Sequence, residues 1–311
     1  MKKEHVLDAK YAVCIPTYNA GSLWEETLKS VVMQDLVGFH KLVVDSGSTD
    51  NTVTLAEQYG FTVIKIDKSE FNHGATRQML ADNTPVACEI CIFLTHDAIL
   101  ATSDSLSKLV EAFHDAEVGI AYGRQLPNKN ATPLEAHLRS FNYPAASNVR
   151  SLADKEKLGF KVFFCSNSFS SYRKTSLQAI GGFPTESIMG EDAIVGAKMI
   201  KAGFRIAYVA EATAHHSHDY KISEEFKRYF DTRVFHEQND WLIKEYGKPT
   251  GEGLKFVKSE LKYAFFQHQR YIVKSIASIF AKWLGYKMGG AYKIMPLSLV
   301  RKLSMHRYYW H

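Results

Sequence analysis

The chain has 311 residues, of which 46% are hydrophobic, enough for one large domain with an appendage or for two small domains. It contains no uninterrupted apolar stretch of about 18 residues, so no transmembrane helix is predicted. The net charge of +5 conceals a basic tail, because from Gly253 onward there are eleven Lys and Arg and a single acid, Glu260. This tail suggests contact with an anionic surface, although a merely solvated tail has the same composition.

The N-terminal part of the chain alternates between two patterns. Short apolar runs rich in β-branched residues predict strands at residues 11–16, 41–45, 61–66 and 90–94. Between them, apolar residues at helical spacing predict helices at residues 22–34, 52–59 and 77–83. This alternation is typical of an α/β sandwich with a mainly parallel sheet. Ligands bind at the carboxyl ends of such strands, where four polar or acidic candidates stand: Thr17, Tyr18, Asp45 and Asp97.

The pattern is less regular further along. Helices are expected at residues 104–114 and 191–202, and strands at residues 162–172 and 204–209. Residues 124–160 contain three prolines and lack clear periodicity, so we expect a mobile excursion there. Whether this excursion closes as a lid is left open. Four cysteines lie in apolar or strand-like stretches and are expected to be buried free thiols in a reducing cytoplasm: Cys14, Cys88, Cys91 and Cys165.

Beyond Lys221 the chain becomes helical and basic. An apolar stripe runs through Leu254, Val257, Leu261, Phe265, Ile272, Ile276, Ile279 and Trp283. The lysines lie largely off this stripe, as in amphipathic helices that rest on a membrane interface. Packing of the stripe on the body or on a second subunit is an equal alternative. We therefore divide the chain into residues 1–220 and a helical, basic region at residues 221–311.

Four motifs follow one another in chain order: VCIPTYN at residues 13–19, KLVVDSGSTD at 41–50, FNHGATR at 71–77 and IFLTHDAIL at 92–100. Together they resemble the nucleotide-sugar half of a family 2 glycosyltransferase, over roughly residues 1–220. The FNHGATR form resembles the bacterial rhamnosyltransferases of that family. The resemblance implies a GT-A, Rossmann-like fold and an inverting transfer of L-rhamnose from dTDP-L-rhamnose. It also implies a lipid-linked cell-surface glycan such as O-antigen as acceptor, at the cytoplasmic face of the plasma membrane.

The resemblance assigns the nucleotide to the first three motifs. Thr17 and Tyr18 line the base pocket, and Asp45 accepts a hydrogen bond from the pyrimidine ring N–H. Without the neighbouring motifs, Asp45 would be better explained as a turn acid in DSGSTD, and the motifs together favour binding.

The third and fourth motifs supply further donor contacts by the same resemblance. Arg77 contacts the base or a nearby phosphate. Asn72, His73 and Gly74 shape the pocket around the diphosphate or sugar, with Gly74 letting the backbone approach the ligand. His96 is assigned to the nucleotide sugar as well.

The family's metal-binding Asp-x-Asp appears here as Thr95-His96-Asp97, with one acid missing. Asp97 matches the metal-binding acid, and His216 of a His-Ser-His segment is the first choice for a second ligand. Imidazole suits Mn²⁺ better than Mg²⁺, and diphosphate oxygens would supply further ligands.

The acceptor side is assigned to a Glu-Asp motif at the start of a helix. The resemblance makes Asp192 the general base that deprotonates the acceptor hydroxyl, although two acids in a first turn also simply favour the helix dipole. Four residues are expected near the sugar or acceptor: Ser166, Asn167, Glu191 and His218. Hydrogen bonds to neighbouring groups within a buried strand would account equally for Ser166 and Asn167.

Three other functions are weighed. A UDP-hexose donor would use the same fold, since uracil and thymine share the edge that Asp45 would contact. A metal-dependent phosphohydrolase would use Asp97, Asp192 and the histidines, but two acids are too few for a convincing two-metal site. A nucleic-acid-binding role for the tail is disfavoured by its apolar stripe, so we expect no nucleic-acid partner. A homo-oligomer is left open.

Overall fold

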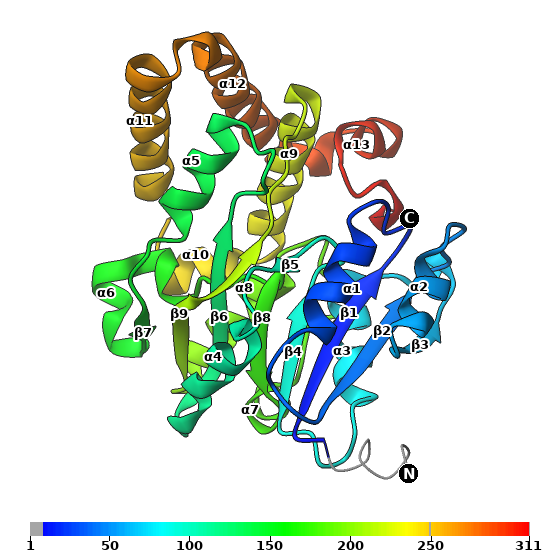
Figure 1. The fold of residues 1–311 in the computed structure, drawn as a ribbon. Helices are drawn as coiled ribbons and strands as arrows, with labels where there is room; N and C mark the ends of the chain where they lie inside the picture. The colour runs from blue at the N-terminus through cyan, green and yellow to red at the C-terminus, as the bar shows by residue number, and fades with distance from the viewer. Residues whose placement is uncertain (1–8, 249, 311) are drawn as a thin grey trace.

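The structure is a computed structural model that describes residues 9–248 and 250–310. Its centre is a nine-stranded sheet of order β3-β2-β1-β4-β8-β6-β9-β5, with β7 paired to β9 (Figure 1). The strands are β1 Tyr11–Thr17, β2 Phe39–Asp45, β3 Thr62–Lys65, β4 Ile90–Leu94, β5 Ile99–Leu100, β6 Val118–Leu126, β7 Asn148–Arg150, β8 Phe169–Arg173 and β9 Arg205–His215. Among them β5, β7 and β8 run antiparallel to the others, so the expected mainly parallel sheet is confirmed.

Helices cover both faces of the sheet. One face carries α1 Trp24–Val32, α2 Thr52–Gln58 and α4 Ser105–Glu111. The other carries α3 His73–Asp82, α7 Lys174–Ala179, α8 Glu191–Lys201, α9 Ile222–Gln238 and α10 Asp240–Tyr246. Strand β1 shows how the two cores arise, because Cys14 packs in one and its neighbour Ile15 in the other. Successive strand residues point to opposite faces, so an apolar run is buried on both sides.

Most predicted elements are present, with shifted bounds. Helix α3 begins four residues earlier than expected because Asn72 caps it, its side chain accepting hydrogen bonds from the backbone N–H groups of Gly74 and Ala75. The strand expected at 162–172 is wrong in its first half. Residues Gly159–Phe163 form a 3₁₀ helix, and the strand β8 begins only at Phe169.

The excursion at residues 124–160 is more ordered than expected. Helix α5 spans Pro133–Asn142 and α6 spans Lys155–Leu158. A capping box begins α5, in which Glu135 reaches back to the backbone N–H of Thr132, and Pro133 occupies the first turn. Hydrophobic periodicity therefore did not predict α5, whereas the residues at its N-terminus indicate a helix.

The region at residues 221–311 is helical, as predicted. Beyond α9 and α10 it contains α11 Thr250–Gln267, α12 Ile272–Gly289 and α13 Leu297–Leu303. Phe230 and Val234 of α9 belong to the same core as α3 and α8. In Figure 1, α11 and α12 form a hairpin that stands above the sheet, with α12 beside α9. The region thus begins inside the main core, extends outward as a hairpin, and returns to the main core at Val300 of α13.

Helix α12 packs against α9 through small residues. A Cβ atom on Gly285 would collide with the carbonyl oxygen of Phe226, and one on Gly289 with that of Phe230. The large apolar side chains face outward instead, so that Ile276 and Trp283 are each 55% exposed. The alternative that the stripe packs on the body of the protein is therefore wrong for Ile276 and Trp283.

Two expectations about composition are also met in the described part of the chain. All four cysteines are buried and free. Within residues 9–248 and 250–310, no helix combines the length and apolar character that a bilayer crossing requires.

Candidate active site

The candidate site lies at the carboxyl edge of the parallel strands. Thr17 at the end of β1 is in register with Asp45 at the end of β2. Asp97 follows β4, and the pairing of β5 with β9 brings it beside the residues that follow β9. Motifs far apart in the chain therefore meet at one edge, as the fold predicts.

At the β1–β2 end, Asp45 organises its own turn. Its carboxylate accepts hydrogen bonds from the hydroxyl of Thr17 at 2.9 Å and from the backbone N–H groups of Gly47 and Ser48. Thr17 and Asp45 are both buried, whereas Tyr18 is 38% exposed. The turn interpretation of DSGSTD is thus correct, and it leaves Tyr18 as the accessible member of the group.

The FNHGATR motif holds the site together. Asn72 caps α3, and its amide donates to the carbonyl of Ser187 at 3.3 Å. Gly74 is required by packing within the protein, and the expected approach of a ligand to its backbone stays a prediction. The space beside Gly74 is filled by the carbonyl of Pro184, with which a Cβ atom would collide. His73 packs edge-on against Phe71 at 5.0 Å between ring centroids.

Arg77 lies beneath the surface and forms an ion pair. Its Nη1 atom is 3.1 Å from Glu191 Oε1, and both side chains are less than a tenth exposed. The same carboxylate oxygen accepts from the amide of Asn167 at 2.9 Å. Asn167 in turn accepts from the hydroxyls of Ser170 and Tyr172. Arg77, Glu191 and Asn167 thus form a buried layer, and their bonds are made within the protein.

Asp192 stands on this layer at the first turn of α8 and is partly exposed. Its carboxylate accepts from the backbone N–H of Asn167 at 3.3 Å and from that of Ala193 at 2.8 Å. Burial raises the pKa of Asp192 to about 7, and the adjacent Glu191 carboxylate raises it further than Arg77 lowers it. A carboxyl with this pKa gains and loses a proton near neutral pH, as a general base must.

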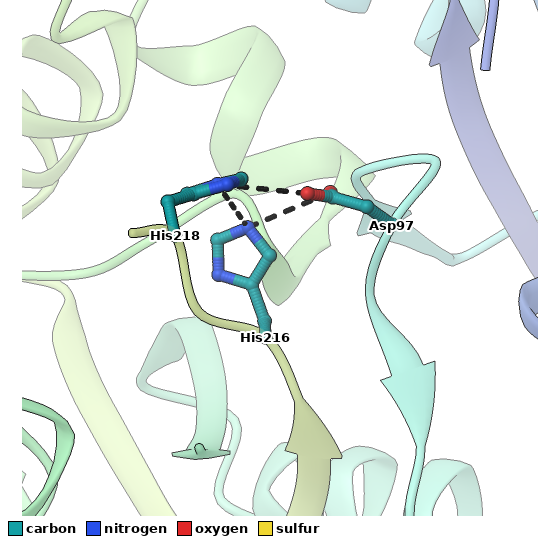
Figure 2. A group of neighbouring side chains, drawn as sticks. All are labelled: Asp97, His216 and His218. Carbon is teal, nitrogen blue, oxygen red and sulfur yellow. Dashed lines mark hydrogen bonds and ion pairs between the residues drawn. The ribbon is translucent and has the colours of Figure 1, made fainter. Parts of the chain in front are cut away.

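Three side chains converge at the other end of the site (Figure 2). Asp97 has one oxygen 3.5 Å from His216 Nε2 and the other 3.5 Å from His218 Nε2, and the two nitrogens are 3.1 Å apart. One carboxylate oxygen and two imidazole nitrogens at this spacing suit a divalent cation. Burial opposes ionisation of Asp97, but the surrounding groups, His216 and His218 foremost, together lower its pKa. His96, in the same loop, is partly exposed.

Gln125 orients the buried His216, and sequence reasoning did not identify it. Its Oε1 atom lies 3.0 Å from His216 Nδ1 and also accepts from Arg139 of α5. Because that oxygen is an acceptor, Nδ1 of His216 carries the proton and Nε2 is free to bind a metal. Burial lowers the pKa of His216 to about 3, which keeps the ring neutral. The amide of Gln125 donates to Ser166 Oγ at 2.9 Å, so Ser166 supports this end of the site.

Comparison with known proteins identifies the family of the chain. The model of the family described as "Glycosyl transferase family 2" matches residues 12–181. The chain is 45% identical to the O-antigen chain rhamnosyltransferase RfbN of Salmonella typhimurium, over 97% of this chain and 96% of that protein. It is 41% identical to the O-antigen chain rhamnosyltransferase WbaN of Salmonella anatum, over the same shares of the two chains.

Solved structures share the fold at low identity. A mannosyltransferase from Pyrobaculum calidifontis, in complex with GDP-Man and Mn²⁺, has a TM-score of 0.57 at 18% identity and covers 97% of this chain and 84% of its own. TarS 1–349 of S. aureus, in complex with UDP-GlcNAc, has a TM-score of 0.55 at 17% identity and covers 95% of this chain and 84% of its own. The chain belongs to glycosyl transferase family 2 and is a glycosyltransferase with a GT-A fold.

Proposed function

We propose that this glycosyltransferase moves L-rhamnose from dTDP-L-rhamnose to a growing O-antigen chain. The observation that carries the proposal is the 45% identity, over nearly the whole of both chains, to an O-antigen chain rhamnosyltransferase. That similarity includes the helical region as well as the catalytic motifs. The geometry supports a nucleotide-sugar transferase, since a cation site and a carboxyl with a pKa near 7 lie at the ligand-binding edge of the sheet.

The proposed reaction is a single displacement. Asp192 accepts the proton of the acceptor hydroxyl while that oxygen bonds to the anomeric carbon, and the bond to the diphosphate breaks on the opposite side. The anomeric configuration inverts, and the proton remains on Asp192 until it leaves to solvent. Glu191 and Arg77 act one layer below by setting the charge around Asp192.

Asp97, His216 and His218 are the proposed ligands of Mn²⁺ or Mg²⁺. When bound, the cation neutralises the diphosphate that departs. The two imidazole nitrogens favour Mn²⁺. His218, first expected near the sugar or acceptor, joins this set because its Nε2 atom lies 3.1 Å from that of His216 and 3.5 Å from an oxygen of Asp97.

We further propose that the α11–α12 hairpin rests on an anionic membrane surface, which would bring the enzyme to a lipid-linked acceptor. Phe280 and Trp283 are 58% and 55% exposed, and Lys258, Lys262 and Arg270 are exposed on the same hairpin. Exposed aromatic residues beside basic ones are typical of interfacial helices. Sedimentation with vesicles containing phosphatidylglycerol should carry the protein down, whereas phosphatidylcholine vesicles and DNA should not. A Phe280→Ser/Trp283→Ser variant that still sediments would contradict the proposal, and loss of a dimer in that variant would assign the face to a second copy instead.

A UDP-hexose transferase and a phosphohydrolase can both be distinguished from the proposed function. We would record the melting temperature with dTDP, UDP, GDP or ADP, each with Mn²⁺, Mg²⁺ or EDTA, because a ligand of the folded state raises it according to affinity. A metal-dependent shift with dTDP above UDP supports the rhamnose donor, and the reverse order supports a UDP-hexose. A phosphohydrolase would cleave dTDP-rhamnose without any acceptor present. Absence of a shift with every nucleotide would overturn the proposal.

A further inference from the structure

The last described residues return to the donor end of the site. Residues 304–310, here called the C-terminal segment, follow α13 and in Figure 1 lie, in red, above the edge where β1 ends. They contact His73 of the FNHGATR motif and Lys68 just before it, both more than 230 positions away in the chain. This contact involves neither Asp192 nor the cation site, so the activity described above does not account for it.

One contact is with the FNHGATR motif. The His306 ring meets that of His73 edge-on at 4.9 Å between centroids, and His306 Nδ1 lies 3.5 Å from His73 Nε2. His73 is itself packed against Phe71. The three rings form a continuous aromatic row from the motif to the C-terminal segment.

A second contact borders the group that includes Tyr18. The ammonium of Lys68 lies 4.3 Å from the centroid of the Tyr18 ring and 4.7 Å from that of Tyr308, and it donates to Tyr18 Oη at 2.7 Å. The Lys68 ammonium therefore lies beside both tyrosine rings, in the segments that follow β1 and β3. Tyr308 is 77% exposed, so this ring contributes little to the core. Flat rings beside a cation suit a base attached to a diphosphate.

The segment is held by a buried carboxylate rather than by its own apolar contacts alone. Asp231 of α9 is fully buried, and its Oδ2 atom accepts from the backbone N–H groups of Met305 at 2.8 Å and His306 at 3.1 Å. Ser304, just before them, is also fully buried. Two charge-assisted hydrogen bonds to consecutive N–H groups fix the direction in which the segment continues toward Tyr308.

We propose that the C-terminal segment is part of the donor site, with Tyr308 as a binding residue for the nucleoside of a pyrimidine nucleoside diphosphate sugar. Lys68 faces the diphosphate, and Asp231 and His306 are positioning residues that hold Tyr308 opposite Tyr18. This inference rests on the proposed function, because it requires a nucleotide at the β1–β2 edge. It adds a contact from the opposite end of the chain to those expected from the motifs.

The test is a titration of dTDP and UDP into the full-length protein with Mn²⁺. Tyr308→Ala should weaken nucleotide binding about tenfold, within the range for loss of one base–aromatic stack. Tyr308→Phe should bind as the wild type, because the ring and not the hydroxyl makes the contact. Phe266→Ala, which removes a comparably exposed ring on α11, is the matched control and should not change the affinity. In turnover measurements KM for the donor should rise in Tyr308→Ala with little change in kcat.

The outcomes separate the two proposals. If the wild-type protein binds dTDP and Tyr308→Ala binds it equally well, the C-terminal segment is not part of the donor site and the proposed function stands. If Phe266→Ala weakens binding as much as Tyr308→Ala, the effect is not local and the inference is also overturned. If the wild-type protein binds no pyrimidine nucleotide, both proposals fail. His306→Ala should give a weaker form of the Tyr308→Ala effect at an unchanged melting temperature.

Discussion

Arg77 and Glu191 form a buried ion pair, Nη1 to Oε1 at 3.1 Å, that joins the FNHGATR motif to the residue preceding the proposed base. The pair explains why a motif identified as a donor contact also determines the acceptor side. Glu191 raises the pKa of Asp192 and Arg77 lowers it, so the two residues together adjust the basicity of a third. Donor and acceptor halves of the site are thus coupled through charges that neither substrate needs to touch.

Arg77→Ala should strongly destabilise the protein, because it leaves the Glu191 carboxylate buried without its counter-charge. Removal of one partner from a buried pair typically lowers the free energy of unfolding by about 3–5 kcal/mol. Urea denaturation monitored by circular dichroism would measure the loss. Lys244→Ala breaks the exposed pair with Asp240 and is the control, expected to leave stability nearly unchanged because solvent screens an exposed pair. Equal effects of the two substitutions would contradict the buried role of Arg77.

Asp192→Asn should abolish transfer and leave nucleotide binding intact. General-base catalysis contributes about 10²- to 10⁴-fold in rate. The N–H groups of Asn167 and Ala193 donate to different oxygens of the carboxylate, so the amide of the variant keeps an acceptor for one of them. Rhamnose transfer and dTDP affinity would be measured on the same preparation. Asp240→Asn, which also changes an acid in the first turn of a helix, should retain activity. Loss of dTDP binding in Asp192→Asn would show that Asp192 does more than accept the proton.

The pH profile should carry the signature of a raised carboxyl pKa. Since the base must be ionised, kcat/KM should rise with pH, with a midpoint at about 7, and level off above it. Glu191→Gln removes the neighbouring negative charge and should move the midpoint to lower pH. A profile that stays flat between roughly pH 5.5 and 8.5 would falsify the assignment of Asp192 as the titrating base.

The same pKa predicts how stability depends on pH. The folded state holds the Asp192 proton up to about pH 7, whereas the unfolded chain loses it near the usual value of 3.8. This contribution is therefore complete below the unfolded pKa and is lost as pH rises through the folded one. Asp192→Asn lacks the dependence, so it should be more stable than wild type above pH 7, by at most about 4 kcal/mol. Melting curves at pH 5 and pH 8 would reveal a gap that widens at the higher pH.

The cation site makes a prediction about binding rather than rate. We expect Mn²⁺ to strengthen dTDP binding by the wild type. The affinity for dTDP in Mn²⁺ should fall by at least about tenfold, toward the affinity in EDTA, in each of the variants Asp97→Ala, His216→Ala and His218→Ala. His215→Ala is the neighbouring control, because that ring bonds to the carbonyl of Pro127 and lies outside the cluster. A wild-type affinity that does not respond to chelator would remove the metal from the site altogether.

The sequence predicts the core of the donor half well because local patterns suffice there. Strands buried on both faces read as continuous apolar runs, so β1, β2 and β4 were placed within about a residue at most bounds. Helix α5 was missed although its signal is local, since Thr132, Pro133 and Glu135 form a capping box that hydrophobic periodicity ignores.

Other site residues have no short-range signal. Gln125 is recognisable only through His216, 91 positions away, and Tyr308 only through Lys68. Asp97 and His216 were found by resemblance to known motifs, but the position of His218 beside them depends on the turn after β9. Such pairings are set by tertiary packing, which a linear pattern does not record.

Helix α12 inverts the usual relation between side-chain size and tolerance to mutation. Its indispensable residues are the smallest, because Gly285 and Gly289 let its backbone lie directly on α9. Two of its large apolar residues, Phe280 and Trp283, are more than half exposed. A mutant library that keeps large residues fixed and varies small ones would protect Trp283 and randomise Gly285. Its misfolded members would then carry substitutions at the glycines, where the helix packs on α9.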